Sequence, residues 1–157
     1  MNKKSRLFKS NTKTMKGVFR PNNPKKYKGN PTNIVYLSSW ELKFMIDLDK
    51  NPDVISWSSE EQPVSYKNPV TGRLCRYYPD FWMKWKDKKG VIKEAVVELK
   101  PFNQTVQPVQ GTQKKATFAK QVMTYAVNQA KWEAARHYCE KKQMQFLLLT
   151  ENELGVK

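Results

Sequence analysis

The chain has 157 residues, with 29 Lys and Arg against 14 Asp and Glu and a formal net charge of +15. This length suffices for one domain with a packed core, and five Trp, seven Tyr and seven Phe argue against a disordered protein. The sequence contains no apolar run long enough for a membrane span, no secretory signal and no zinc-binding pattern. The two distant cysteines, Cys75 and Cys139, are expected to be reduced packing residues of an intracellular protein. The charge favours a polyanionic partner such as nucleic acid.

Residues 1–33 are expected to form a basic arm, extended or partly ordered, ahead of one domain at 34–157. The arm has no acid and carries ten basic residues: Lys3, Lys4, Arg6, Lys9, Lys13, Lys16, Arg20, Lys25, Lys26 and Lys28. Such a segment is expected to neutralise DNA phosphates without reading their sequence, although a solubilising tail would look the same. Three further residues are expected to contact the DNA backbone: Arg76, Lys114 and Lys115.

The domain is predicted to begin with a helix over 40–48, because Ser38-Ser39 provides an N-cap and Asn51-Pro52 a stop. Two short extended pieces, 54–57 and 63–66, follow with a polar joint between them. A turn at 68–72 then leads to the next strand.

Residues 75–86 alternate as one strand, and the hairpin turn 87–90 connects it to a partner strand over 91–100. A polar loop at 104–112 precedes a long helix from 114 to about 142. Its apolar positions form an i, i+4 ladder: Val122, Ala126, Ala130, Ala134 and Tyr138, flanked by Ala119, Met123 and Val127. The strand 146–149 has no polar alternation, as in the middle of a covered sheet.

Three polar residues converge on the predicted hairpin. Asp80 follows Pro79, which interrupts a ladder of hydrogen bonds, and Glu98 and Lys100 share one face of the partner strand. A symmetric hairpin places Asp80 opposite Val97, so a one-residue bulge is needed to bring Asp80 and Glu98 to one face. The carboxylates stand in apolar segments, where an unpaired charge is costly to bury.

Two carboxylates and a lysine suit metal-assisted hydrolysis of a phosphodiester. Mg²⁺ prefers oxygen ligands and keeps several waters, so two carboxylates suffice, and Mn²⁺ is expected to substitute for it. The ion would stabilise charge on the phosphate, and Lys100 would position or activate the attacking water. The chain has no P-loop, nucleophile elbow or His-rich motif that would indicate other chemistry. The same three residues could instead form a structural ion pair.

Pro79-Asp80 followed by Glu98-x-Lys100 resembles the PD-(D/E)xK nuclease motif, and the element order resembles the αβββαβ core of that superfamily. Gln121-x-x-x-Tyr125 is similar to a motif that follows the lysine in RecB-like members. The finer pattern, over roughly residues 34–150, resembles the TnsA-type transposon endonucleases and the head-completion nucleases of T-even-like tailed phages. That pattern comprises SSWE at 38–41, LDxNPxV at 48–54, WxxEE at 57–61, Tyr66, RYYPDF at 76–81 and VELKP at 97–101.

The resemblance implies a metal-dependent DNA endonuclease with a restriction-endonuclease-like α/β (α+β) fold, a mixed sheet flanked by helices. In the phage case it implies a protein of virion assembly, in the host cytoplasm and the virion, that acts on packaged DNA ends or the filled head before tail joining. The implied metal ligands are Asp80, Glu98, the Leu99 carbonyl and Glu41. Lys100 would serve the water, and Gln121 would steady the water or the phosphate. Implied partners are double-stranded DNA, portal or neck proteins, and a second copy on DNA.

Alternatives stay open for several of these residues. Glu41 also fits a first-turn acid favoured by the helix dipole, and Tyr125 also fits a core aromatic. One of Glu60 and Glu61 could bind metal or orient the first strand, while the other is solvated. The main rival function is a non-enzymatic DNA-binding head or connector protein on a nuclease-like fold. An RNA-binding domain is disfavoured, because no RNA-module signature is present.

Overall fold

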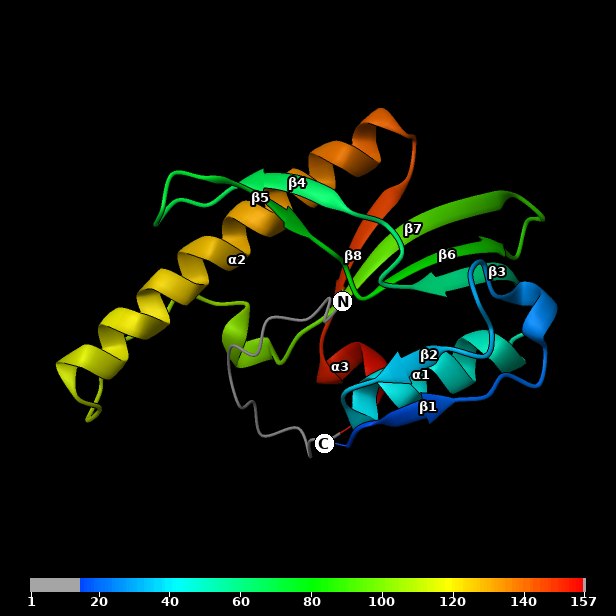
Figure 1. The fold of residues 1–157 in the computed structure, drawn as a ribbon, viewed down its shortest axis with the longest axis horizontal. Coiled ribbons are helices and arrows are strands. Elements are labelled where there is room, and N and C mark those ends of the chain that lie inside the picture. The colour runs from blue at the N-terminus through cyan, green and yellow to red at the C-terminus, as the bar shows by residue number, and fades with distance from the viewer. Residues whose placement is uncertain (1–14, 157) are drawn as a thin grey trace.

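A computed structural model of the chain, which describes residues 15–156, contains a four-stranded mixed sheet with a helix on one face and a longer helix on the other (Figure 1). The elements in chain order are β1 (Gly17–Phe19), η1 (Pro24–Lys26), β2 (Ile34–Tyr36), α1 (Ser39–Lys50), β3 (Val54–Ser59), β4 (Val64–Lys67), β5 (Leu74–Tyr77), β6 (Phe81–Lys86), β7 (Ile92–Leu99), η2 (Phe102–Gln104), α2 (Lys115–Lys141), β8 (Gln145–Leu149) and α3 (Glu151–Leu154). Within the described range, no helix combines the length and apolar character that a membrane crossing requires.

The sheet has the order β3-β6-β7-β8, in which all pairs are antiparallel except the parallel pair β7-β8. This arrangement confirms the predicted succession of helix, three antiparallel strands, long helix and strand, and with it the predicted fold class. The expectation that 146–149 lies in the middle of the sheet is wrong, because β8 is an edge strand. Its apolar run reflects cover on both faces, since Leu147 and Leu149 face the α1 side while Phe146 and Leu148 face the α2 side.

The strand predicted over 75–86 is two strands, β5 and β6, separated at residues 78–80. The facing chain breaks at the same level, between β3 and β4 at residues 60–63. β6 and β3 stay in the main sheet, whereas β5 and β4 form a separate two-stranded ladder that packs against α2. Residues 60–63 therefore face residues 78–80, four residues against three. The long hairpin, which consists of β3 and β4 followed by β5 and β6, bends away from the sheet at this point.

The hairpin between β6 and β7 has a different register from the predicted one. Lys86 pairs with Ile92 and Phe81 with Val97, so the connection contains an odd number of residues. Gly90 adopts a φ of 79°, in the left-handed region that such a turn requires and that glycine enters without strain. One further step in this register places Asp80 directly opposite Glu98. No bulge is needed between β6 and β7 to bring the two carboxylates to one face.

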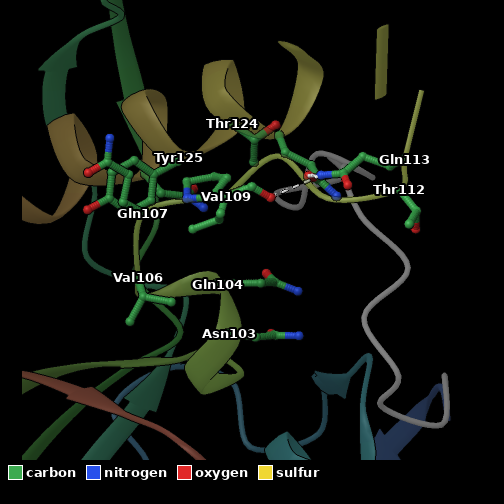
Figure 2. Close-up of a pocket in the computed structure, with 12 residues that line it drawn as sticks. Asn103, Gln104, Val106, Gln107, Val109, Thr112, Gln113, Thr124 and Tyr125 are labelled. Carbon is green, nitrogen blue, oxygen red and sulfur yellow. Dashed lines mark hydrogen bonds between the residues drawn. The ribbon is translucent and has the colours of Figure 1, made fainter. Parts of the chain in front are cut away.

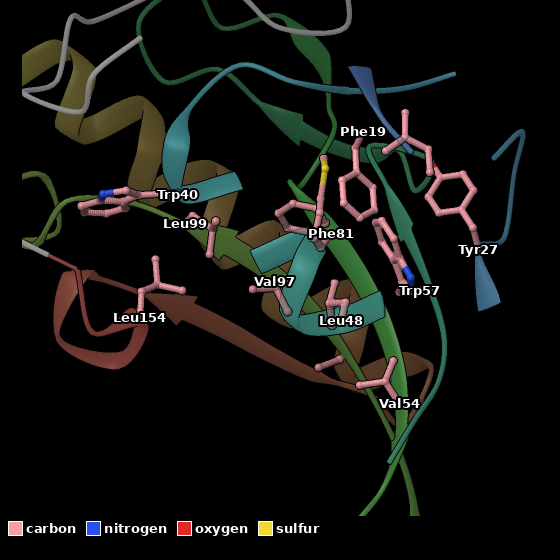
Figure 3. Packing of buried hydrophobic residues seen from close by; sticks show 13 residues of the cluster. Phe19, Tyr27, Trp40, Leu48, Val54, Trp57, Phe81, Val97, Leu99 and Leu154 are labelled. Carbon is pink, nitrogen blue, oxygen red and sulfur yellow. The ribbon is translucent and has the colours of Figure 1, made fainter. Parts of the chain in front are cut away.

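The α1 face holds the larger core, which includes Trp40, Leu48, Phe81, Val97 and Leu99 (Figure 3). Helix α1 begins as predicted, because Ser38 Oγ accepts the backbone N–H of Glu41 at 3.1 Å. It ends before Asn51-Pro52, also as predicted.

The α2 face holds a second core of Val64, Tyr66, Tyr77, Trp132 and Ala135. Only the C-terminal part of the predicted apolar ladder on α2 contributes to it. Ala130, Ala134 and Tyr138 pack against this core, whereas Val122 and Met123 are 42% and 46% exposed. The N-terminal part of α2 projects beyond the sheet in Figure 1.

The segment from 17 to 33 packs into the domain, which differs from the expected boundary at residue 34. Strand β1 pairs with β2, and the rings of Phe19 and Tyr27 contact Trp57 in the α1-face core. The buried Asp49 carboxylate accepts the backbone N–H groups of two residues, Asn22 and Asn23, at 2.8 and 3.0 Å. Residues 1–14 of the predicted arm lie outside the described residues.

Candidate active site

The site is built where the long hairpin leaves the sheet. Pro79 is buried at the break and cannot donate to a ladder, so β5 ends and β6 begins on either side of it. Across the break, the backbone N–H of Glu60 donates to the Asp80 carbonyl at 3.1 Å. Glu60 has a φ of 54°, which is a strained conformation for a residue with a side chain. The bend thus places Asp80 between Glu60, which directly follows β3, and Glu98 on β7.

Asp80 and Glu98 lie on the face of the sheet that α2 covers. Glu98 pairs with Leu148, which belongs to the α2-face core, and directly opposed residues share a face. Asp80 Oδ2 accepts the backbone N–H of Leu99 at 2.8 Å, which holds this carboxylate at the end of β7. The structure therefore brings together the two carboxylates that the sequence singled out.

Glu98 is buried, and two neighbours contact its carboxylate. The Tyr77 hydroxyl donates to Oε2 at 3.0 Å, and Lys100 Nζ lies 3.4 Å from Oε1. Burial, reinforced by the charge of Asp80, raises the pKa of Glu98 to about 7, although Lys100 and Tyr77 act in the opposite direction. Burial beside the same two carboxylates also raises the pKa of Tyr77, which therefore acts as a hydrogen-bond donor at neutral pH.

Lys131 on α2 is a fourth charged member that the sequence analysis missed. Its Nζ lies 5.7 Å from the ring centroids of both Tyr66 and Tyr77, within the range of cation–π contacts. Burial lowers the pKa of Lys131, the charge of Glu98 raises it and that of Lys100 lowers it further, so both act on this ammonium group. The sequence indicated this residue only by its position on the helix, because Lys131 lies four residues before the buried Ala135 and therefore on the packed face.

Glu41 is buried in the first turn of α1, and its Oε2 accepts the backbone N–H of Leu37 at 2.9 Å. Its neighbour Trp40 packs in the same core as Leu99, so this turn lies at the end of β7 that carries Glu98 (Figure 3). Among the described residues, no three His, Cys, Asp or Glu side chains form a group that could hold a metal. The structure thus does not group Glu41 with Asp80 and Glu98.

Gln121 lies apart from this centre. Its Oε1 accepts Gln113 Nε2 at 3.2 Å, and both residues line a pocket between α2 and the loop that follows η2 (Figure 2). Gln121 precedes Lys131 by ten residues, which corresponds to about 15 Å along a helix. Lys131, not Gln121, is the α2 residue that interacts electrostatically with Glu98.

The basic residues predicted to bind DNA have different surroundings. Lys26 Nζ donates to the carbonyls of Asp49 and Asn51 at the end of α1, at 3.0 and 2.7 Å, so this lysine contributes to the packing of α1. The exposed members are Lys16, Arg20, Lys25, Lys28, Arg76, Lys114 and Lys115. Lys3, Lys4, Arg6, Lys9 and Lys13 lie outside the described residues.

The donor set at the centre fits a hard divalent cation. Asp80 and Glu98 provide carboxylate oxygens, which Mg²⁺ and Mn²⁺ prefer, and Mg²⁺ fills its other positions with water. The raised pKa of buried Glu98 reflects negative charge that its surroundings do not fully offset. A cation beside the two carboxylates would reduce that cost.

A family model described as TnsA-like endonuclease N terminal matches residues 51–151, a range that contains Asp80, Glu98, Lys100 and Lys131. The head completion nuclease of Enterobacteria phage T4 is 39% identical over 142 residues, which cover 88% of this chain and 92% of the T4 protein. The chain therefore belongs to the TnsA-like endonuclease family.

Proposed function

We propose that the protein is a metal-dependent DNA endonuclease that acts in the completion of phage heads. The observation that carries this proposal is the single face shared by Asp80, Glu98 and Lys100 in a member of an endonuclease family. The name of the T4 relative supports the assembly step. The substrate would be double-stranded DNA, as packaged ends or in the filled head before tail joining. The protein would act in the host cytoplasm and the virion, beside portal or neck proteins.

Asp80, Glu98 and the Leu99 carbonyl would hold Mg²⁺, or Mn²⁺ in its place. Glu41 is not grouped with these two carboxylates, so from its turn of α1 at the end of β7 it would act on a water of the ion and not as a direct ligand. When bound, the ion lowers the pKa of a coordinated water and stabilises charge on the phosphate. Tyr77 would keep Glu98 in one orientation through its hydrogen bond to Oε2.

Two lysines would act directly on the reacting groups. Lys100, beside Glu98 Oε1, would position the attacking water or help to remove its proton. Lys131, from the helix that covers this face, would hold a phosphate oxygen as negative charge develops on it. The exposed basic residues would hold the DNA backbone without reading bases. Two copies on one DNA would be needed to cut both strands.

The test is a plasmid-cleavage assay with wild-type protein, Asp80→Ala, Lys100→Ala and Glu41→Gln, each in Mg²⁺ and in EDTA. We expect the wild type to cut only with the ion, and Asp80→Ala and Lys100→Ala to retain DNA binding while losing cutting. Glu41→Gln keeps an acceptor for Leu37, so its stability should be preserved while its requirement for Mg²⁺ rises.

The controls separate an enzyme from a structural protein. Absence of wild-type cutting in Mg²⁺ and Mn²⁺, on linear, branched and supercoiled DNA, would overturn the endonuclease proposal in favour of a DNA-binding assembly protein. If Lys100→Ala still cuts DNA, the catalytic site does not lie at the end of β7. Thermal unfolding of each variant excludes loss of activity through misfolding.

A further inference from the structure

A second candidate binding site lies next to the catalytic centre. A cavity of about 600 Å³ opens between helix α2 and the loop that follows η2 (Figure 2). This volume falls within the usual range of small-ligand pockets. The Gln113 side chain forms part of the wall of the cavity. Its Nε2 donates one hydrogen bond to the Val109 carbonyl and one to Gln121 Oε1, both at 3.2 Å. This side chain therefore joins the loop to the helix.

The lining is neutral and rich in amides. Six of the twelve lining residues carry a primary amide: Asn103, Gln104, Gln107, Gln113, Gln121 and Asn128. None of the twelve is charged, although 27% of the chain is Asp, Glu, Lys or Arg. The lining offers no charged side chain to a phosphate or a metal ion, and its amides both donate and accept hydrogen bonds, which suits a neutral ligand with donors and acceptors of its own.

Nucleobases have this chemistry. Their edges present donors and acceptors that Asn and Gln match with paired hydrogen bonds, and their faces stack on aromatic rings. Tyr125 supplies such a ring, and Figure 2 shows it on α2 at the side of the pocket, with Asn103 and Gln104 projecting from η2 below.

The surroundings favour nucleic acid over a protein segment. Lys114 and Lys115 directly follow Gln113 and are exposed, so the rim is basic while the interior is neutral. A nucleotide has the same division, with a charged phosphate and an uncharged base. The pocket also adjoins the catalytic centre along the chain, because Asn103 follows Lys100 by three residues and Asn128 precedes Lys131 by one helical turn.

We propose that this pocket receives an unpaired nucleobase of the DNA substrate, beside the phosphate that is cut. The inference rests on the proposed function and narrows its substrate to DNA with a single-stranded end or a locally opened pair. A base inside the pocket would hold the strand in register with the carboxylates. Unpaired bases enter such pockets most readily because no base pair must first be broken.

The test measures binding of two duplexes in EDTA, one blunt and one with a short overhang that carries the fluorescent base 2-aminopurine. We expect the wild type to bind the overhang duplex at least about 5-fold more tightly, the lower limit for stacking one base on an aromatic ring. The 2-aminopurine emission should fall on binding. Tyr125→Leu and Gln107→Ala should lose the preference and restore the emission, with unchanged affinity for the blunt duplex.

Gln110→Ala is the matched control, because Gln110 is an exposed amide of the same loop outside the lining. The inference would be overturned if the pocket variants bound both duplexes equally less tightly than the wild type does. It would also be overturned if the pocket variants bound the two duplexes as Gln110→Ala does. A loss of association between protein molecules, with DNA binding intact, would identify a protein ligand instead. Equal binding of both duplexes by the wild type would refute only the proposal that the pocket receives a nucleobase. Binding of neither duplex would also refute the proposal that the protein is a DNA endonuclease. Gln107 lies in an exposed loop, so its variant tests the pocket even if Tyr125→Leu fails to fold.

Discussion

Replacing Glu98 by Gln tests whether a buried, charged carboxylate stands at the centre of this protein. Burial and the charge of Asp80 raise the pKa of Glu98 to about 7, against an ordinary value of 4.5. A raised carboxyl pKa means that the folded state binds a proton more tightly than the unfolded state does. The stabilisation is therefore complete below pH 4.5 and is lost as the pH rises through 7.

The size of the effect follows from these two values. They differ by about 2.5, and each pH unit corresponds to 1.36 kcal/mol, so ionisation of Glu98 costs the folded protein about 3 kcal/mol. Gln keeps the shape of the side chain and carries no charge. We expect Glu98→Gln to gain about 3 kcal/mol of unfolding free energy relative to wild type between pH 4.5 and 8, in EDTA. Subtraction of the two profiles removes the contribution of titrating groups that do not interact with Glu98.

Urea unfolding across this pH range measures the difference. Glu94→Gln is the control for replacing a carboxylate by an amide, because Glu94 lies on the same strand at a partly exposed position. A difference between Glu98→Gln and wild type that stays constant across the range would refute the buried-charge argument. Mg²⁺ should raise the stability of the wild type at pH 8 and leave Glu98→Gln unchanged, since the variant lacks the charge that the ion would offset.

Three further substitutions test neighbouring contacts. Tyr77→Phe removes the hydrogen-bond donor to Glu98, so the unfolding free energy at pH 8 should fall by roughly 1–3 kcal/mol. Because this hydrogen bond lowers the pKa of Glu98, the rise of the cutting rate with pH should move to higher pH in the variant. An unchanged pH dependence of cutting would contradict the role of this hydroxyl. Lys131→Gln should slow cutting by roughly 100-fold at saturating DNA, with partial recovery in Lys131→Arg and no effect of Lys141→Gln on the exposed end of α2. Proportional losses of binding and cutting would instead make Lys131 a general DNA contact. Asp49→Ala leaves the backbone N–H groups of Asn22 and Asn23 without their acceptor, so the unfolding free energy measured by thermal unfolding should fall by roughly 2–3 kcal/mol. A smaller loss would mean that water replaces the carboxylate.

The pairing of Asp80 with Glu98 could be predicted from local sequence because the hairpin turn and the two-residue period of strands are short-range properties. The position of Lys100 follows from the same period. The prediction failed by one residue in the register, since the connection from Lys86 to Ile92 has five residues and not the four of the predicted turn. The bend at residues 78–80 was visible only as Pro79. Its direction depends on β4 and β5 packing against α2, which is a long-range contact.

The packed segment at 17–33 was hidden by composition. Its lysines and asparagines are typical of an arm that binds phosphates, yet Lys26 and the backbone of Asn22 and Asn23 bond to α1 and to Asp49. Two aromatic residues, Phe19 and Tyr27, carried the opposite signal, because their rings would be costly to leave exposed to water. A count of charges does not distinguish a lysine that binds carbonyl groups at a helix end from one that binds DNA.

Helix length explains why Gln121 is displaced from the chemistry. The 27 residues of α2 span about 40 Å, whereas the eight residues of β7, the longest strand, span about 26 Å. A helix this long cannot lie over the sheet along its whole length, and the part that packs is the part that carries Trp132 and Ala135. The periodicity of the helix identifies its packed face but not the stretch that the sheet covers. A change at Gln121 should therefore alter the binding of DNA ends in the neighbouring pocket, whereas a change at Lys131 should alter the rate of cutting.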